Sequence, residues 1–198
     1  ILAGHLLPGL APNGVPSNLK NTIFPFNYNC FKELETITNQ HDIGVIIMEV
    51  SRNKGPEDNF LEKVRQLASA KSIVLIFDEC TSGFRQTFGG LHKIYGVEPD
   101  MAMFGKALGN GYAINAVIGR REVMEAAQSS FISSTFWTER IGPTAALKTL
   151  DVMERLKSWE IITATGNTIR QGWLQLAQKY ALDIEIWGLS ALSGFTIK

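Results

Sequence analysis

The chain has 198 residues, of which 45% are hydrophobic and 19% are charged, a composition typical of a globular protein with one substantial core. Its formal net charge is zero, so we expect no broad basic surface for nucleic acid or anionic lipid. No apolar run approaches the about 20 residues that a membrane-spanning helix needs. The two cysteines, Cys30 and Cys80, indicate neither a zinc site nor a disulfide framework, which favours a soluble protein of the reducing cytoplasm.

The first predicted elements follow a segment, residues 6–26, that is rich in proline and glycine and is expected to be a long surface connection. A weak helical pattern covers residues 31–40. Residues 43–50 then form a continuous apolar run of strand length. Such a run predicts a parallel strand that is buried on both faces.

An amphipathic helix is predicted to begin at Pro56, because proline is tolerated at the first helical position and the acidic Glu57 and Asp58 favour a helix N-terminus. Apolar residues recur on one face of the segment that follows. Residues 72–77 form a second apolar run. A strand, a helix and a strand in this order predict an α/β fold with a mostly parallel central sheet and helices on both faces.

Two further strands are predicted, at residues 101–104 and 113–118. The connection between them is too short for a helical crossover, so the fourth strand should lie antiparallel to the third. Helical patterns then cover three segments, residues 122–128, 142–156 and 162–180.

The C-terminal part alternates between apolar and polar residues from Leu182 to Ile186, which predicts the first strand of a separate, half-exposed sheet. We therefore expect a domain boundary near Lys157. Residues 1–157 would form part of a large domain, and residues 158–198 a linking helix and the start of a small C-terminal α+β domain. Since the chain starts at Ile1 and ends inside a strand pattern, we also expect it to be a piece of a longer protein.

An acid and an amine stand where two of the predicted strands end. Asp78 directly follows the second strand, and Lys106 comes two residues after the third. In α/β proteins the ligand crevice lies beyond the carboxyl ends of the strands. A structural ion pair is the simpler alternative, but three glycines surround Lys106, at 105, 109 and 111, and glycines allow a backbone to approach a planar or phosphorylated ligand closely.

Nucleotide binding is a weaker interpretation of the same segment. A P-loop would need serine or threonine after the lysine and a glycine five residues before it, where this chain has Ala107 and Met101. A dinucleotide-type glycine signature is also missing. The histidines and cysteines show no spacing that is typical of metal ligands, so no metal site is expected.

Three motifs carry a resemblance to a known family. They are Asp-Glu-Cys-Thr-Ser-Gly-Phe-Arg at residues 78–85, Tyr-Gly-Val-Glu-Pro-Asp at 95–100 and Gly-Lys-Ala-Leu-Gly-Asn-Gly at 105–111. In order and spacing they resemble the signature of the class III aminotransferases, which use pyridoxal 5′-phosphate (PLP). The Gly83-Phe84-Arg85 ending is closer to the glutamate-1-semialdehyde aminomutase branch than to the omega-aminotransferases.

The resemblance implies the fold type I of PLP-dependent transferases, with most of the large cofactor-binding domain in this chain. It also implies amino-group transfer between a small-molecule amino donor and a keto or aldehyde acceptor, by a homodimer that binds neither nucleic acid nor membrane. Aminotransferase and 2,1-aminomutase chemistry both stay open. A non-catalytic fragment or scaffold that keeps the aminotransferase fold is the alternative.

Residue roles also follow from the resemblance. Lys106 would be the Schiff-base lysine, Asp78 the acid that pairs with the pyridine nitrogen, and Cys80 would replace the usual valine against the cofactor ring. Thr135 resembles the threonine that reaches the cofactor phosphate of a neighbouring subunit. Because the residues that follow it depart from the family pattern, Thr138 is a second candidate, and capping of the next helix is a competing explanation for either hydroxyl.

Glu49 stands at the end of the first predicted strand, where the family has Glu-Pro. Val50 replaces the proline. A role for Glu49 on the substrate side is therefore left open.

Overall fold

The computed structural model describes residues 14, 16–19, 21–133 and 135–198, and divides into two compact units, residues 1–43 and residues 44–198. The first unit contains a short 3-10 helix, Ser17–Leu19, and helix α1, Phe31–Gln40, which confirms the helix predicted there. Within this unit the rings of Phe24 and His41 stack with their centroids 4.0 Å apart. The first part of the predicted surface connection, with the prolines at 8 and 12, lies outside the described residues.

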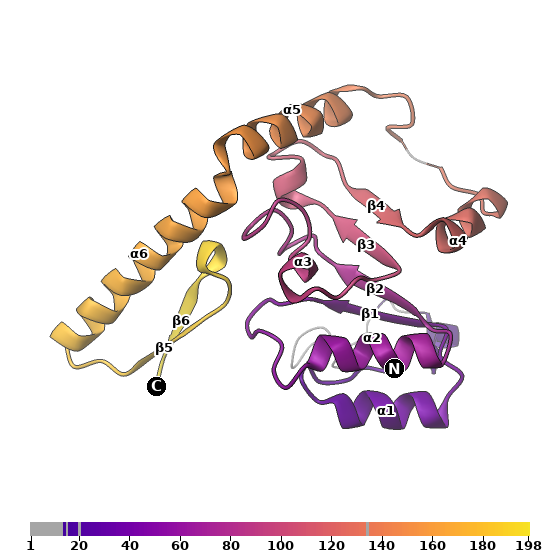
Figure 1. The fold of residues 1–198 in the computed structure, drawn as a ribbon, viewed down its shortest axis with the longest axis horizontal. Coiled ribbons are helices and arrows are strands. Elements are labelled where there is room, and N and C mark those ends of the chain that lie inside the picture. The colour runs from indigo at the N-terminus through magenta and orange to yellow at the C-terminus, as the bar shows by residue number, and fades with distance from the viewer. Residues whose placement is uncertain (1–13, 15, 20, 134) are drawn as a thin grey trace. The chain divides into compact units, whose positions relative to one another are not determined.

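A four-stranded sheet forms the centre of the second unit (Figure 1). Its strands are β1 (Val45–Glu49), β2 (Val74–Asp78), β3 (Met101–Phe104) and β4 (Ala116–Gly119), and they lie in this order across the sheet. β1, β2 and β3 are parallel, and β4 is antiparallel to β3. The mostly parallel sheet and the antiparallel fourth strand are therefore confirmed.

The two faces of the sheet differ in burial. On one face, Leu75 and Phe77 of β2 have no exposed surface. On the other face, Val45 and Ile47 of β1 are 51% and 53% exposed. The prediction that β1 is buried on both faces is thus wrong for the part of the chain that the structure describes, because only alternate residues of the apolar run are covered.

Helix α2, Phe60–Ala70, connects β1 to β2. Its buried face consists of apolar residues at helical spacing, namely Phe60, Leu61, Val64 and Ala68. The predicted start at Pro56 is wrong. Asp58 and Asn59 both adopt left-handed backbone angles, with φ of 49° and 55°, which a right-handed helix cannot include.

The later helices differ from the prediction mainly at their ends. The segment predicted as one helix over 122–128 is a short α4, Arg121–Met124, followed by a 3-10 turn. Helix α5 covers Ile141–Leu156 and α6 covers Ser158–Lys179, so α6 begins four residues before the predicted position. Lys157 alone separates the two helices and has a left-handed φ of 48°. The short helix α3 covers His92–Tyr95.

Strands β5 (Ile184–Trp187) and β6 (Gly194–Ile197) pair antiparallel in a sheet of their own, which confirms the separate C-terminal sheet. The turn between them packs directly on α6. A side chain at Gly166 of α6 would place its Cβ 1.9 Å from the carbonyl oxygen of Ser190. Glycine at this position therefore allows helix and turn to touch.

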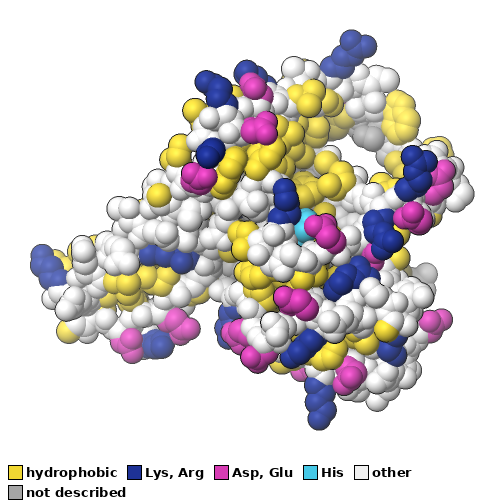
Figure 2. All heavy atoms as spheres, viewed as in Figure 1, with side chains coloured by type: hydrophobic (Ala, Val, Ile, Leu, Met, Phe, Trp, Pro, Cys, Tyr) yellow, Lys and Arg dark blue, Asp and Glu magenta, His cyan; other side chains and the backbone are white. Residues whose placement is uncertain are grey.

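Charged side chains of both signs are interspersed over the face that Figure 2 shows, as the balanced composition leads one to expect. Among the described residues, no helix is both long enough and apolar enough to cross a membrane. The same residues contain no cluster of three or more histidine, cysteine or acidic side chains that could hold a metal ion.

Candidate active site

Two carboxylates lie side by side at the carboxyl edge of the sheet. Glu49 ends β1 and Asp78 ends β2, and the two residues are partners in the parallel register. Since the residues of such a pair point to the same face of a sheet, both side chains leave the sheet on the same side. The sequence had suggested that Asp78 directly follows the second strand. In the structure it is the last residue of β2.

Asp78 is held by the residue two positions further along the chain. Its Oδ1 accepts a hydrogen bond from the backbone N–H of Cys80 at 3.0 Å. Burial raises the pKa of the Cys80 thiol, and the nearby carboxylate of Asp78 raises it further. The backbone of Cys80 therefore orients the acid, while its side chain stays a neutral thiol.

Lys106 returns to this edge from the loop after β3. Its Nζ donates a hydrogen bond to Oγ1 of Thr81 at 3.1 Å. Its backbone has a left-handed φ of 45°, and its carbonyl accepts the N–H of Asn110 at 3.0 Å. The lysine is thus the first residue of a tight turn whose geometry carries the side chain back toward β2.

Gly105, just before the lysine, is required by close packing. A Cβ there would lie 2.4 Å from Oδ1 of Asn115 and 3.3 Å from Sγ of Cys80. At Gly109 a Cβ would lie 2.3 Å from the carbonyl oxygen of Tyr112. The atoms that these two glycines accommodate belong to the chain itself, whereas the sequence analysis had assigned the glycines to a ligand.

The charged groups at the edge are close enough to affect one another. Burial raises the pKa of Glu49, Asp78 raises it further, and Arg52, Lys106 and a hydrogen bond with Thr81 lower it, with a raised pKa as the net result. Nη1 of Arg52 lies 3.7 Å from Oε1 of Glu49. Asp78 and Lys106 therefore both contribute to the electrostatic environment of Glu49.

A buried acid anchors the segment that follows Asp78. Glu79 has no exposed surface, and its Oε1 accepts the backbone N–H of His92 at 3.0 Å and lies 2.9 Å from Nδ1 of the same residue. The hydroxyl of Ser82 donates to Oε2. Burial raises the pKa of Glu79, but the hydrogen bonds from His92, Ser82 and the N–H of Leu91 outweigh this effect and lower it. Because Glu79 is ionised, Nδ1 of His92 carries the proton.

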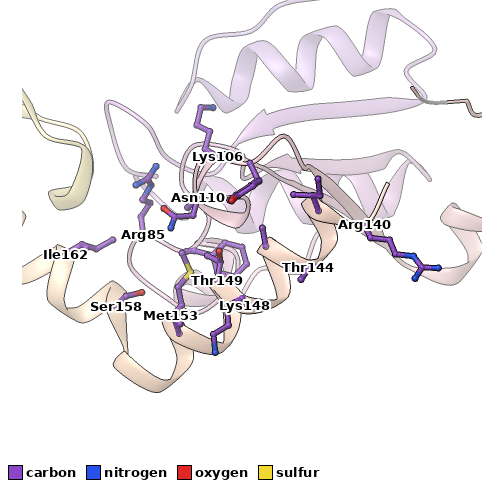
Figure 3. A pocket seen from close by; sticks show the side chains of 17 residues that line it. Arg85, Lys106, Asn110, Arg140, Thr144, Lys148, Thr149, Met153, Ser158 and Ile162 are labelled. Atoms are coloured by element: carbon purple, nitrogen blue, oxygen red, sulfur yellow. The ribbon is translucent and has the colours of Figure 1, made fainter. Parts of the chain in front are cut away.

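A cavity of about 1060 Å³ lies beside the lysine loop, between that loop and helices α5 and α6 (Figure 3). Its lining is largely apolar and includes four cationic residues and no carboxylate: Arg85, Lys106, Arg140 and Lys148. Figure 3 shows the Lys106 side chain extending from the loop on the side away from α5. The amine thus borders the cavity without pointing into its centre.

The predicted site residues are brought together only in part. Asp78, Cys80 and Lys106 meet at the sheet edge. Thr135 and Thr138 are exposed in the segment before α5, and within the described part of the chain neither is hydrogen-bonded to the three. The competing explanation, that a threonine caps α5, is wrong, because Glu139 accepts the N–H groups of residues 141 and 142.

With this geometry established, comparison with known proteins identifies the family. Residues 26–198 match the model of the class III aminotransferase family. The chain belongs to the class III aminotransferase family.

Among curated relatives, it is 36% identical to a 3-aminobutyryl-CoA aminotransferase of Cloacimonas acidaminovorans over 93% of this chain and 47% of the relative. It is 32% identical to a glutamate-1-semialdehyde 2,1-aminomutase of Methanococcoides burtonii over 90% of this chain and 44% of the relative. The chain thus spans about half the length of the curated relatives it matches. Transferases and aminomutases both occur among them, so the preference for the aminomutase branch stays a prediction.

The fold of this class III chain is that of solved PLP transaminases. An omega-transaminase from Sphaerobacter thermophilus superposes with a TM-score of 0.83 at 24% identity, over 96% of this chain and 45% of the other. The FumI protein of Sphingopyxis sp. MTA144, solved in its PLP internal aldimine form, gives a TM-score of 0.85 at 23% identity, over 88% of this chain and 44% of the other. The predicted α/β fold of the PLP-dependent transferases is therefore confirmed.

Two residues contact the site although the sequence did not indicate a role for them. Thr81 contacts Lys106, and Asn115 packs against Gly105. Neither position carries a signal in a single sequence, because a threonine in a loop and an asparagine before a strand are ordinary turn residues. Only the fold brings them to the lysine.

Proposed function

We propose that the protein transfers amino groups with PLP as its cofactor, from a small-molecule amino donor to a keto or aldehyde acceptor. The observation that carries this proposal is the convergence of Asp78, Cys80 and Lys106 at the carboxyl edge of the sheet. The family membership of the chain supports the same chemistry.

The residues at the edge fit this cofactor. Lys106 offers a primary amine for the aldehyde carbon, and Asp78 offers a carboxylate, held in place by Cys80, for the protonated pyridine nitrogen. Cys80 adds a small, neutral contact for the ring. When bound, PLP supplies an electron sink for the electrons left by a broken C–H bond.

Residues of the chain would then handle the proton transfers of the reaction. The Nζ atom of Lys106, once it is free, would take the proton from the α-carbon of the substrate and deliver it to the cofactor carbon that carries the amino group. Asp78 would keep the ring nitrogen protonated. Closely packed Gly105 restricts the loop, so the amine and the acid keep their spacing.

A homodimer is part of the proposal. The segment before α5 carries large apolar side chains that are exposed, with Phe131 at 96%, Phe136 at 61% and Trp137 at 70%, and such a patch favours a protein partner. A second copy would bury these side chains and bring Thr135 or Thr138 to the cofactor phosphate of its neighbour. The cytoplasm is the proposed location, and residues 1–157 and 158–198 are the proposed parts of the large and small domains.

A PLP titration followed by borohydride reduction tests the function. We expect a saturable change in the cofactor absorbance band and a stable mass increase on the peptide that contains Lys106. Lys106→Arg should abolish both, whereas Lys63→Arg, on the exposed side of α2, should change neither. Asp78→Asn should weaken binding.

The same experiment separates the alternatives. Absence of saturable binding by the wild-type protein, or a label spread over other lysines, would reject the assignment and favour a scaffold that keeps the fold. If PLP binds, an assay against a panel of amino donors distinguishes the two chemistries. Release of a keto acid from the donor indicates a transferase. A product in which the amino group has moved within the same molecule, with no keto acid released, indicates an aminomutase.

A further inference from the structure

Thr81 contacts the amine of Lys106 and lies close to the carboxylate of Glu49. Lys106 Nζ donates to Thr81 Oγ1 at 3.1 Å, and Thr81 helps to lower the pKa of the Glu49 carboxyl. The three residues belong to three segments: the end of β1, the turn after β2 and the loop after β3. The fold therefore brings one hydroxyl close to two charged groups.

The direction of the hydrogen bond between Lys106 and Thr81 follows from the chemistry of the groups. A lysine ammonium can only donate, an ionised carboxylate can only accept, and a hydroxyl has one proton to give. Thr81 therefore accepts from Lys106, which leaves its own proton for the nearby carboxylate of Glu49. A proton given to that carboxylate would keep the oxygen lone pairs of Thr81 turned toward the amine.

The chain segment that carries the Thr81 hydroxyl is anchored by buried side chains. Thr81 belongs to a segment with two fully buried side chains, Glu79 and Ser82, each with 0% exposure, and those side chains are hydrogen-bonded to each other. Nη1 of the exposed Arg52 lies 3.7 Å from Oε1 of Glu49. The buried side chains on either side of Thr81 therefore restrain the segment that carries its hydroxyl.

We propose that Thr81 is a positioning residue for Lys106, and that Glu49 acts through Thr81 to keep one N–H of the amine directed at the hydroxyl. The remaining face of the amine, including its lone pair once it is neutral, is then directed away from Thr81 toward the open side of the site. This inference rests on the proposed function for the use of the amine, but the ordering of the amine itself needs no cofactor. It also assigns Glu49, left open by the sequence, to orienting the lysine.

Side-chain NMR of the lysine ammonium groups tests the ordering without cofactor. The signal of Lys106 is assigned by its loss in Lys106→Arg, and its order parameter is compared with that of exposed Lys63. We expect Thr81→Val, which keeps the shape and removes the hydroxyl, to lower the order of Lys106 to that of Lys63. Thr81→Ser should restore the order of Lys106. The matched control Thr165→Val, at an exposed position of α6, should leave the order of Lys106 at the wild-type value.

Substitutions at Glu49 test the direction of the hydrogen bonds. Glu49→Gln keeps an oxygen that can accept from Thr81, so Lys106 should stay ordered. Glu49→Ala frees the hydroxyl to rotate, so the order should fall. If Thr81→Val leaves Lys106 as ordered as in the wild type, or if Thr81→Ser is as disordered as Thr81→Val, the positioning role is rejected. Equal values for Glu49→Gln and Glu49→Ala would reject the part assigned to Glu49.

A second measurement, with PLP added, keeps this inference separate from the proposed function. The rate at which Lys106 captures PLP, trapped with borohydride, should fall about fivefold in Thr81→Val, the effect of losing one hydrogen bond of ordinary strength, and should recover in Thr81→Ser. If the wild type captures no PLP while Thr81→Val still disorders Lys106, the cofactor proposal fails and the positioning role stands. An unchanged capture rate in Thr81→Val would contradict the use of this positioning in the reaction.

Discussion

Removal of the buried acid Glu79 should destabilise the protein more than any single change on its surface. Its carboxylate receives hydrogen bonds from the backbone N–H and Nδ1 of His92 and from the Ser82 hydroxyl. In Glu79→Ala these donors lose their acceptor in a site that has no exposed surface. An unsatisfied buried donor costs roughly 1–3 kcal/mol, and some of the donors here can recover a water molecule, so the unfolding free energy should fall by about 4 kcal/mol.

Glu79→Gln is the matched variant. The amide oxygen can still accept from both His92 groups, and the amide NH₂ can donate to Ser82 if that hydroxyl turns round. What is lost is the charge on the acceptor, which is worth about 1.5 kcal/mol. Because Glu79 directly follows Asp78, Glu79→Ala should also weaken PLP binding, and Glu79→Gln should do so much less.

Urea unfolding at pH 7, followed by circular dichroism, measures the two changes. The folded-state pKa of Glu79 is lowered, so its contribution is fully present above the unfolded pKa, ordinarily about 4.3, and is lost as the pH falls through the lower folded value. The difference in unfolding free energy between the wild type and Glu79→Gln should therefore become smaller at acidic pH. The reasoning is refuted if the unfolding free energy of Glu79→Ala lies within about 1 kcal/mol of the wild-type value, or if Glu79→Gln is as unstable as Glu79→Ala.

Two further predictions concern other contacts. Burial raises the pKa of Asp100, but its hydrogen bonds with the N–H of Leu75, Arg65 and Arg120 lower it overall, so Asp100→Asn should cost about 2 kcal/mol at neutral pH. In urea titrations this loss should diminish below about pH 4, where an unfolded aspartate takes up its proton, and a loss that stays constant down to pH 2 would contradict the lowered pKa. Gly105→Ala should destabilise the protein by roughly 1–3 kcal/mol and slow PLP capture, because its Cβ would lie 2.4 Å from Oδ1 of Asn115. Adding Asn115→Ala should recover part of the loss, and strict additivity of the two changes in a double-mutant cycle would rule out this clash.

The order of elements could be predicted because the hydrophobic pattern records it. The apolar runs at β1, β2 and β3 and the amphipathic α2 indicated the parallel sheet, and the short connection before β4 indicated its antiparallel direction. Helix ends were less predictable, because they depend on single backbone angles. Asp58 and Asn59 both tolerate a left-handed backbone, and nothing in the residues before them distinguishes that turn from the first turn of a helix starting at Pro56.

The site was predictable where chemistry and position coincide in the chain. Asp78 and Lys106 stand at strand ends, so their meeting followed from the rule for parallel sheets. The contact between Thr81 and Lys106 was not predictable, because a hydrogen bond between segments 25 residues apart leaves no trace in the local sequence pattern. The burial of β1 was overestimated for a related reason: an apolar run shows which residues can be covered, but not which face is.

The single residue between α5 and α6 gives the C-terminal sheet a pivot. Helix α6 has 22 residues and is therefore about 33 Å long, so a rotation of 10° at Lys157 would swing its far end by about 6 Å. The rings of Trp159 and Phe88 also pack together, with centroids 5.6 Å apart. Among the described residues, two hydrogen bonds join the C-terminal part to the site segments: Thr163 to the carbonyl of Arg85 at 3.2 Å, and the N–H of Gly188 to the carbonyl of Asn53 at 3.0 Å. Both attach to the segments that follow Asp78 and Glu49, so a tilt of the C-terminal part would reach the two loops beside the proposed site.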